Sequence, residues 1–199
     1  GNDTFVAANH ALQGGLQAAA RKNEMSERRQ VEAARGREKL GLARQRATNE
    51  IQRLVAGRPL PRFHLILLEQ AWADVLSLAL LRGGEDSDGW RDLREATAAI
   101  VEASATPIQS TRDPAFVAKL QDALGQVGYH AEDAGAIARQ LANGRTEDAD
   151  LASRTELIVQ LRARARLGEE NVARTAVAQA PHNPAEQAAH ATLAIHADG

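Results

Sequence analysis

A long stretch without helix breakers limits what this chain can fold into. From about Glu24 to Ala56 there is no proline and only two glycines, and polar residues dominate. We expect one long helix here, with Asn23 or Ser26 near its start. Its apolar residues recur at steps of three and four, which places one set on a single face: Leu40, Ala43, Ala47, Ile51 and Leu54. The C-terminal half should therefore pack on a core, while the N-terminal half projects or pairs with the weaker segment 4–20.

Residue usage extends the helical prediction to the rest of the chain. There are 41 alanines, and aromatic residues make up only 3%. Alanine and the other abundant residues favour helices, whereas the β-branched and aromatic residues that strands prefer are sparse. The net charge of -2 does not point to nucleic acid or an acidic membrane surface. Because there is no cysteine, disulfides, thiolate metal sites and a cysteine nucleophile are excluded.

Proline and glycine divide the chain into about six or seven helices, which predicts an irregular all-α bundle with one long N-terminal helix. Beyond the long helix, over about 24–56, we expect helices over about 61–82, 90–106, 114–127, 132–142 and 147–167. Residues 1–168 should form a single all-α domain. Residues 169–199 are Ala-rich with few large apolar side chains, so we expect a peripheral helix or linker there.

The helix over 61–82 should be the central one, because it is apolar on most of its circumference. We expect one face with Leu65, Leu68, Trp72, Val75 and Leu76, a second with Leu67, Ala71, Leu78 and Leu81, and a polar strip of Gln70, Asp74 and Ser77. Its apolar run, Leu65–Leu81, contains Glu69 and Asp74, and a lipid-facing span would rarely tolerate both. We therefore predict a buried helix of a soluble protein and no membrane span, with Trp90 packed near it.

The stretch Gly83–Trp90, GGEDSDGW, holds three carboxylates and raises the question of an ion site. Against the helix-loop-helix calcium pattern, several later positions match. However, Gly84 offers no side-chain oxygen at the first ligand position, and the positive charge of Arg91 opposes a cation. A corner between two helices explains the stretch better: one glycine ends the first helix in a left-handed conformation, and Asp86 or Ser87 caps the next.

No other motif points to a catalytic, cofactor-binding or metal-binding residue, and we predict none. No histidine pair has the HExxH spacing. His182, Glu186 and His190 are spaced four apart, but Pro184 lies between them in the Ala-rich tail. The patterns GxGxxG, GxxxxGK[ST] and GxSxG are absent. The two carboxylates of the central helix, Glu69 and Asp74, are five residues apart and do not share a face, so we expect a single buried carboxylate paired with Arg rather than an active-site acid.

A basic stretch from Arg21 to Arg58 holds 11 Lys or Arg against five Glu. Five of these cations recur at steps of about four or seven and form what we call the Arg ridge: Arg28, Arg35, Lys39, Arg46 and Arg53. Such a ridge can lie against phosphates. However, Glu24 and Glu32 each lie four residues from a cation of the ridge, and no aromatic residues interleave for base stacking. A solvated helix, a protein-docking surface and a nucleic-acid surface remain open, in that order of preference.

Several short motifs follow one another in a recognisable order. They are Glu-Arg-Arg from Glu27, Gly-Arg-Glu-Lys-Leu from Gly36, Gly-Arg-Pro-Leu-Pro from Gly57, Trp72 in an apolar helix, and Gly84-Glu85-Asp86-Ser87 with Trp90. This order resembles the bacterial family catalogued as domain of unknown function 1631, over residues 27–108 and more weakly to about Asn143. The resemblance implies a helical, cytoplasmic bacterial protein of several times this length, and it implies no reaction and no catalytic residue. Where the family is expected to have Leu-Trp-Ser, this chain has Glu102-Ala103-Ser104, so we expect that helix to pack differently.

We therefore expect a non-enzymatic interaction or regulatory module of a larger bacterial cytoplasmic protein, acting by helix-mediated docking or self-association. The chain starts at Gly1 and its single methionine is Met25, so we interpret it as part of a longer protein. A protein partner or a second copy is expected, without any cofactor. The alternative is that the Arg ridge binds a phosphate-bearing ligand, either nucleic acid or a signalling nucleotide. An enzyme with an unrecognised active site is the least favoured interpretation.

Overall fold

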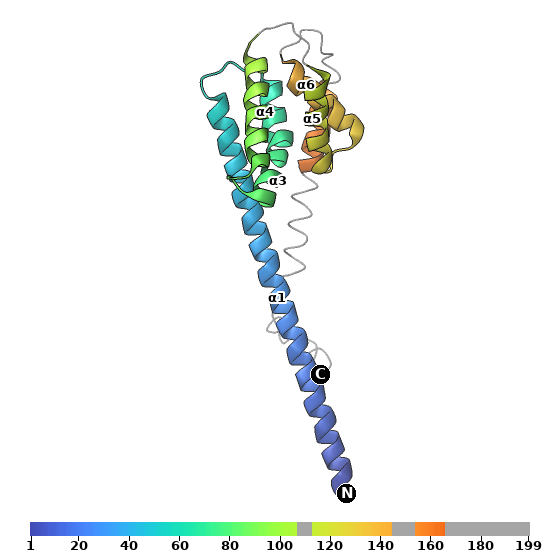
Figure 1. Cartoon of the computed structure of the whole chain (residues 1–199). Helices are drawn as coiled ribbons and strands as arrows, with labels where there is room; N and C mark the ends of the chain where they lie inside the picture. Colours follow the sequence, from blue (N-terminus) through green and yellow to red (C-terminus); the bar gives the residue numbers. More distant parts are fainter. Residues whose placement is uncertain (107–112, 145–153, 166–199) are drawn as a thin grey trace, which may run out of the picture. The chain divides into compact units, whose positions relative to one another are not determined.

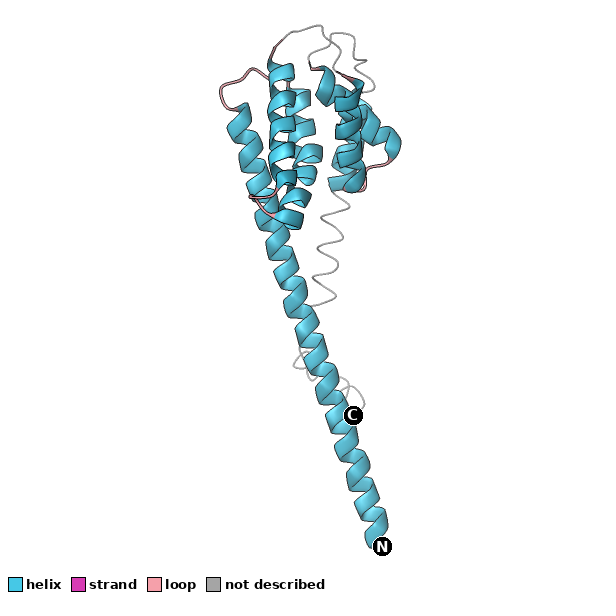
Figure 2. Cartoon of the chain, in the orientation of Figure 1, coloured by secondary structure: helices cyan, strands magenta, loops and turns pink. Residues whose placement is uncertain are grey.

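The computed structural model describes residues 1–106, 113–144 and 154–165, and these residues are mostly helical (Figures 1 and 2). The helices are α1 (Asn2–Val55), α2 (Arg62–Leu67), the π-helical turn η1 (Leu68–Trp72), α3 (Ala73–Gly83), α4 (Asp88–Ala105), α5 (Pro114–Gln126) and α6 (Ala131–Asn143). Residues 154–165 are also helical. The described residues contain no strand, so the prediction of an all-α fold with a long first helix is confirmed.

The chain divides into two compact units, Gly1–Arg162 and Ala163–Gly199. The second unit lies almost wholly outside the described residues. The predicted domain boundary near residue 168, the predicted peripheral segment 169–199 and the start of the helix predicted from residue 147 lie there or in the undescribed stretch 145–153. The core and the candidate surfaces all belong to the first unit.

Helix α1 is longer than the sequence predicted. It begins at Asn2 and runs through Gly14 and Gly15, so a start near Asn23 and a separate segment over 4–20 are wrong. Each glycine in a helix interior costs only about 1 kcal/mol relative to alanine, and no proline precedes Pro59 to stop the helix. The predicted packing face is confirmed: Ala43, Ala47 and Ile51 are buried, and Leu54 packs against the core.

The central helix is continuous from Arg62 to Gly83 but contains the π-helical turn η1 in its middle. A π turn inserts an extra residue and rotates the following face by about one residue. Ser77, expected on a polar strip, is buried and donates to the carbonyl oxygen of Ala73 (2.6 Å), whereas Leu81, expected on an apolar face, is exposed. Those two expectations were wrong, whereas Val75 and Leu76, which follow the turn, are buried as expected. Leu67, before the turn, and Leu68 and Ala71, within it, are fully buried.

The core of the first unit is built where the central helix meets its neighbours. Helix α3 packs against α1, α4 and α5, while α6 packs against α2, α4 and α5 (Figure 1). Trp72 and Trp90 are both buried in one cluster with apolar residues from every one of these helices. Trp72 Nε1 donates to Thr97 Oγ1 of α4 (2.8 Å), which satisfies both buried polar groups.

The corner Gly83–Trp90 is built as the sequence predicted. Gly84 follows α3 with a φ of 75°, and the Ser87 side chain accepts a hydrogen bond from the Trp90 amide to cap α4. Gly83 is required for a different reason, since a Cβ there would lie 2.6 Å from the Ser87 Cβ. Helix α5 likewise begins as expected, with Asp113 as its cap and Pro114 in its first turn.

Candidate interaction surface

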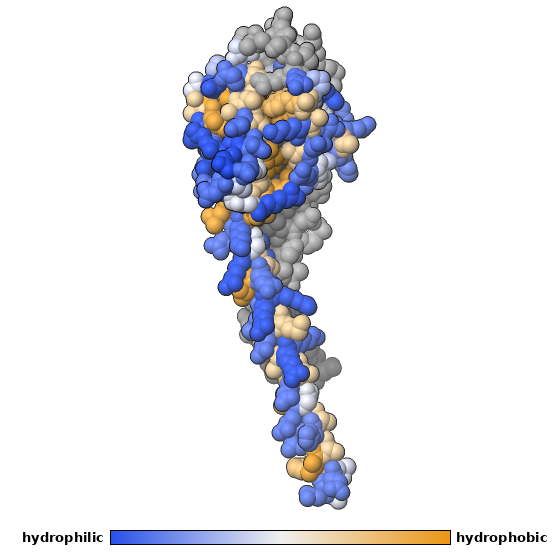
Figure 3. Space-filling model, in the orientation of Figure 1, coloured by the Kyte–Doolittle hydropathy of each residue, from blue (hydrophilic) through white to orange (hydrophobic). Residues whose placement is uncertain are grey.

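The N-terminal part of α1 is the longest continuous run of exposed residues in the described chain. Every residue from 1 to 32 is exposed, and the first buried residue of α1 is Ala43. Large apolar side chains lie open on it, with Phe5 72% exposed and Leu12 and Leu16 each 64% exposed. Figure 3 shows apolar residues at the surface of this part of the helix. Isolated exposed apolar residues are ordinary, but several within three or four turns of one helix indicate a docking surface.

This surface has two sections of different chemistry. Between Asp3 and Arg21 no residue carries a formal charge, although every one of them is exposed. From Arg21 onward, charged residues of both signs are dense. An exposed helix that stays in water is usually covered in charged side chains, so the charge-free section, residues 4–20, is the unusual one.

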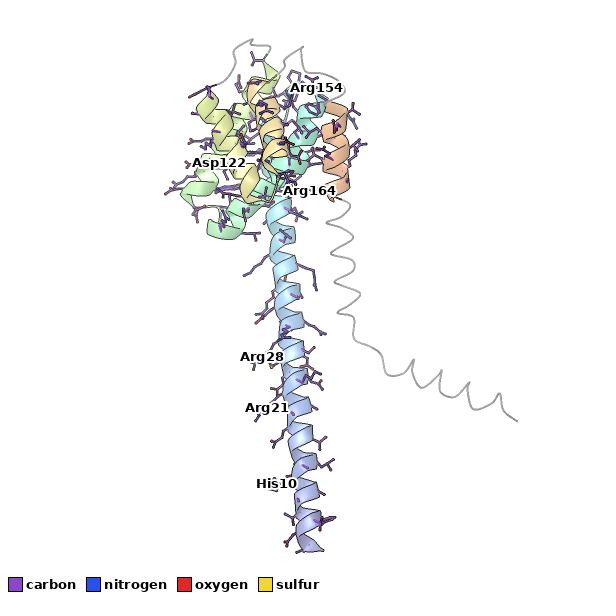
Figure 4. The ribbon with its side chains drawn as sticks, turned by 90° about the vertical axis from the view of Figure 1, so that its right-hand side faces the viewer. His10, Arg21, Arg28, Asp122, Arg154 and Arg164 are labelled. Atoms are coloured by element: carbon purple, nitrogen blue, oxygen red, sulfur yellow. The ribbon has the colours of Figure 1, made fainter. Side chains whose placement is uncertain are left out.

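The Arg ridge does not act as one surface. Arg28, Arg35 and Lys39 are exposed on the free part of α1, and Figure 4 shows Arg28 projecting from the helix, as do His10 and Arg21. A hollow of about 400 Å³ brings two of its cations together with three glutamates and one apolar residue: Glu24, Glu27, Arg28, Val31, Glu32 and Arg35. The mixture of signs lowers the positive potential that a phosphate would meet.

Arg46 and Arg53, the other two ridge residues, bind a buried carboxylate of their own helix. The Glu50 side chain is 2% exposed. Arg53 Nη2 donates to Glu50 Oε1 (2.6 Å), Arg46 Nη1 donates to Oε2 (3.2 Å), and Arg94 of α4 donates to Oε1 (2.8 Å). Three guanidinium groups therefore surround one carboxylate where α1 meets α4.

In this Glu50 cluster three positive guanidinium groups face one buried carboxylate, and this shifts the pKa of Glu50. The hydrogen bond from Arg53, helped by those from Arg94 and Arg46, outweighs the cost of burial and lowers the pKa of Glu50 to about 2. Glu85, in the corner before α4, supplies a second carboxylate: Arg46 Nε donates to its Oε1 (2.6 Å), and this contact raises the pKa of Arg46. The Arg46 guanidinium also lies 5.6 Å from the centre of the Trp90 ring.

Glu50 was not among the predicted site residues, although the sequence contains a signal for it. Glu50 lies three residues after Ala47 and one before Ile51, so it falls on the apolar face of α1, with arginines at steps of four and three. A charged residue on a face that packs against a core must be paired. The acidic corner residue Glu85 has a role beyond the helix turn, because it ties the corner to α1.

A second polar region lies where α2 and α6 meet the helical residues 154–162 of the first unit. A pocket of about 350 Å³ there is lined by aromatic, apolar and charged residues: Phe63, Glu132, Asp133, Ala136, Arg139, Gln140, Arg154, Glu156, Leu157 and Gln160. The Arg154 guanidinium lies 5.3 Å from the centre of the Phe63 ring. The described residues of the lining include no serine, threonine, cysteine or histidine, and their polar groups are carboxylates, guanidinium groups and amides.

His64 is buried close to this region. It is 2% exposed, and its Nδ1 has no hydrogen-bond partner among the described residues. Burial, and to a smaller extent the charge of Arg154, lowers the pKa of His64 to about 4. The imidazole is therefore neutral at physiological pH and belongs to the packing of α2.

The two carboxylates of the central helix lie in different surroundings. Glu69 is exposed. Asp74 is half-buried, lies 3.8 Å from Arg44 and accepts a hydrogen bond from the Tyr129 hydroxyl (3.3 Å).

Among described residues, no three His, Cys, Asp or Glu side chains converge on a point that could hold a metal ion. In the part of the chain that the structure describes, one helix, Arg62–Gly83, is long and apolar enough to span a membrane, but half of its apolar stretch is buried, and the core helix of a soluble protein passes the same test.

Comparison with known families matches the profile described as "Protein of unknown function (DUF1631) third domain" to residues 33–142, more than half of the chain. The chain belongs to the DUF1631 family. The resemblance in the sequence is thereby confirmed. The matched part of this DUF1631 chain contains the Glu50 cluster, the corner Gly83–Trp90 and most of the core, and it leaves out the charge-free section of α1. Comparison with curated proteins and with solved structures gives no match.

Glu102-Ala103-Ser104, where the resemblance led us to expect Leu-Trp-Ser, lies at the end of α4. In this DUF1631 chain Glu102 forms an ion pair with Arg58 of the α1–α2 loop, and Ser104 is buried and donates to the carbonyl oxygen of Ile100 (2.9 Å). Gly144, which follows α6 with a φ of 63°, lies against this turn: a Cβ there would be 2.3 Å from the carbonyl oxygen of Ala103. A small residue at position 103 leaves room for that close approach.

Proposed function

We propose that this DUF1631 domain is a non-enzymatic interaction or regulatory module of a larger cytoplasmic bacterial protein, and that it docks through the exposed N-terminal part of α1. The single observation that carries the proposal is the charge-free section, residues 4–20, which is exposed along its whole length. Its apolar side chains gain most from being removed from water, and no charged group nearby has to be desolvated when a partner covers it.

The Glu50 cluster supports this role because it fixes the base of the docking helix. Glu50 joins two arginines of α1 to Arg94 of α4, and Arg46 extends the network to Glu85 in the corner. Hydrogen bonds in which both partners are charged are directional and among the stronger ones in proteins. A docking helix held in this way presents its free part in a defined direction from α3 and α4, which lowers the entropy lost when a partner binds.

The alternative function, binding of nucleic acid or a signalling nucleotide by the Arg ridge, has less support. Arg46 and Arg53 already bind Glu50, and Arg28 and Arg35 share their hollow with three glutamates. Phosphate binding needs cations whose charge is not already balanced. The two proposals differ in their salt dependence, since phosphate binding weakens steeply with added salt whereas apolar docking does not.

The test compares two doubly substituted chains in an affinity pull-down from an extract of the source cells. The variant Leu12→Glu with Leu16→Glu places two charges on the apolar side of the charge-free section and should lose the captured protein. The control, Gln13→Glu with Gln17→Glu, adds the same charge at the same spacing but about 100° around the helix, and should keep it. Equal capture by both variants, or capture that disappears with salt and with Arg28→Ala, would reject docking through this face.

A further inference from the structure

Apolar residues of α1 recur every seven residues, from the bundle to the charge-free section. Stepping by seven from Leu54 toward the N-terminus gives a line of mostly apolar or small residues: Leu54, Ala47, Leu40, Ala33, Ser26, Ala19, Leu12 and Phe5. A seven-residue repeat is the spacing at which one helix packs along another. Each step of seven turns the line by about 20° around a straight helix, so its N-terminal end lies on a different side of α1 from Leu54. The bundle covers Ala43, Ala47 and Ile51, where α1 contacts α3, whereas every residue of the line from Ser26 to Phe5 is exposed.

Near the N-terminus a second line at steps of seven, Ala8, Gly15 and Lys22, lies beside the first. Together the two lines form what we call the N-terminal seam, whose residues follow at alternating steps of three and four: Phe5, Ala8, Leu12, Gly15, Ala19 and Lys22. The seam has large side chains at Phe5, Leu12 and Lys22 and small residues between them, and all six residues are exposed. It is about 27 Å long at 1.5 Å per residue. A partner that fits the seam must place a small residue opposite Leu12 and a long side chain opposite Phe5.

We propose that the occupant of the N-terminal seam is the same seam of a second copy of this chain, running antiparallel. A two-fold axis between Leu12 and Gly15 places Leu12 opposite Gly15 of the second copy, and Ala8 opposite its Ala19. The large side chain of each copy thus meets the smallest residue of the other, and a two-fold axis makes both contacts at once. This inference rests on the proposed docking function and names its partner.

The charges decide the direction of the pair. In a parallel pair each seam residue meets itself, so Lys22 would face Lys22 and, one heptad on, Arg29 would face Arg29. Like charges facing each other in a seam are destabilising. In the antiparallel pair Lys22 instead meets Phe5 of the second copy, where its aliphatic stem covers the ring and its ammonium group can lie over the ring face. The charge-free section then pairs mainly with itself.

An interface of this length is small, so the dimer is weak and its population depends on protein concentration. Light scattering on the complete 199-residue chain should show an average mass that rises from monomer toward dimer as concentration increases. Leu12→Glu with Leu16→Glu should weaken association about tenfold or more, while Gln13→Glu with Gln17→Glu leaves it unchanged. A monomer at every concentration overturns the proposal.

The chain contains no cysteine, so single cysteines report the direction directly. An equimolar mixture of Ala8→Cys and Ala19→Cys chains should form a disulfide-linked dimer on mild oxidation, and each variant alone should not. Linkage of each variant with itself means a parallel pair and rejects the proposed arrangement. If no linkage and no dimer mass appear while Leu12→Glu with Leu16→Glu still loses a captured protein, the second copy is wrong and docking through α1 stands. If Leu12→Glu with Leu16→Glu also captures the protein unchanged, both the second-copy proposal and docking through α1 are rejected.

Discussion

At the scale of single residues, Glu50 shows how one side chain can join two elements. It is a buried carboxylate on an otherwise apolar face, and it is tolerated because Arg53, Arg46 and Arg94 all donate to it. Removing one member of a buried pair leaves the others without compensation. The three arginines reach solvent, with side-chain exposures between 37% and 58%, so part of that loss is relieved by water.

We therefore predict that Glu50→Gln lowers the free energy of unfolding by about 1–3 kcal/mol, measured by urea denaturation at neutral pH. Because the pKa of Glu50 is about 2 in the folded chain and near 4.5 when unfolded, its contribution is complete above pH 4.5 and is lost as pH falls toward 2. The variant should lose that part of the acid dependence. Glu85→Gln, at an exposed site, is the control, and an equal effect from both variants would contradict the assigned role.

His64 makes a second prediction at this scale. Its folded pKa of about 4 lies below the value of 6.5 for a free imidazole, so the unfolded chain takes up the proton first. Stability should be complete above pH 6.5 and should fall by roughly 3 kcal/mol between pH 6.5 and 4. Phe63 and Arg154 are the neighbours that a protonated imidazole would meet.

Replacing His64 by Leu should flatten this part of the pH profile, measured as urea midpoints from pH 7 to 4. The exposed His130, changed to Gln, serves as the control and should retain the slope. A slope that survives His64→Leu would show that another group causes it.

At the scale of elements, the sequence predicted most helices because their ends are local. Ser87, Asp113 and the glycines at 84, 128 and 144 act within one or two turns, and the structure places helix ends at each of them. The start of α1 was missed because Gly14 and Gly15 look like breakers but cost less than the rest of the helix gains. The π turn over Leu68–Trp72 was missed because no residue type marks it, and beyond it the burial of Ser77 and the exposure of Leu81 were not predicted.

At the scale of the whole molecule, the part that matches the family profile and the free part of α1 separate in the chain. The DUF1631 profile begins at residue 33, and residues 1–32 have no buried side chain. We predict that deleting residues 1–32 leaves cooperative unfolding intact and shifts the urea midpoint little, while the total helical signal in circular dichroism falls. Loss of cooperative unfolding would show that this part of α1 is needed for the fold. The same deletion should abolish concentration-dependent dimerisation.

The sequence by itself determined the helical class, the family, the corner before α4 and the face by which α1 packs, because each depends on residues close together in the chain or on their order. Only the tertiary structure decided which residues of the Arg ridge are ion-paired and which are exposed. Glu50 pairs with Arg46 and Arg53 of its own helix, and from far along the chain Arg94 reaches Glu50 while Glu85 reaches Arg46. The ridge therefore divides into two ion-paired residues and three exposed ones. Charge spacing along a helix fixes which side chains share a face, but their electrostatic environment depends on which carboxylates the fold brings to them.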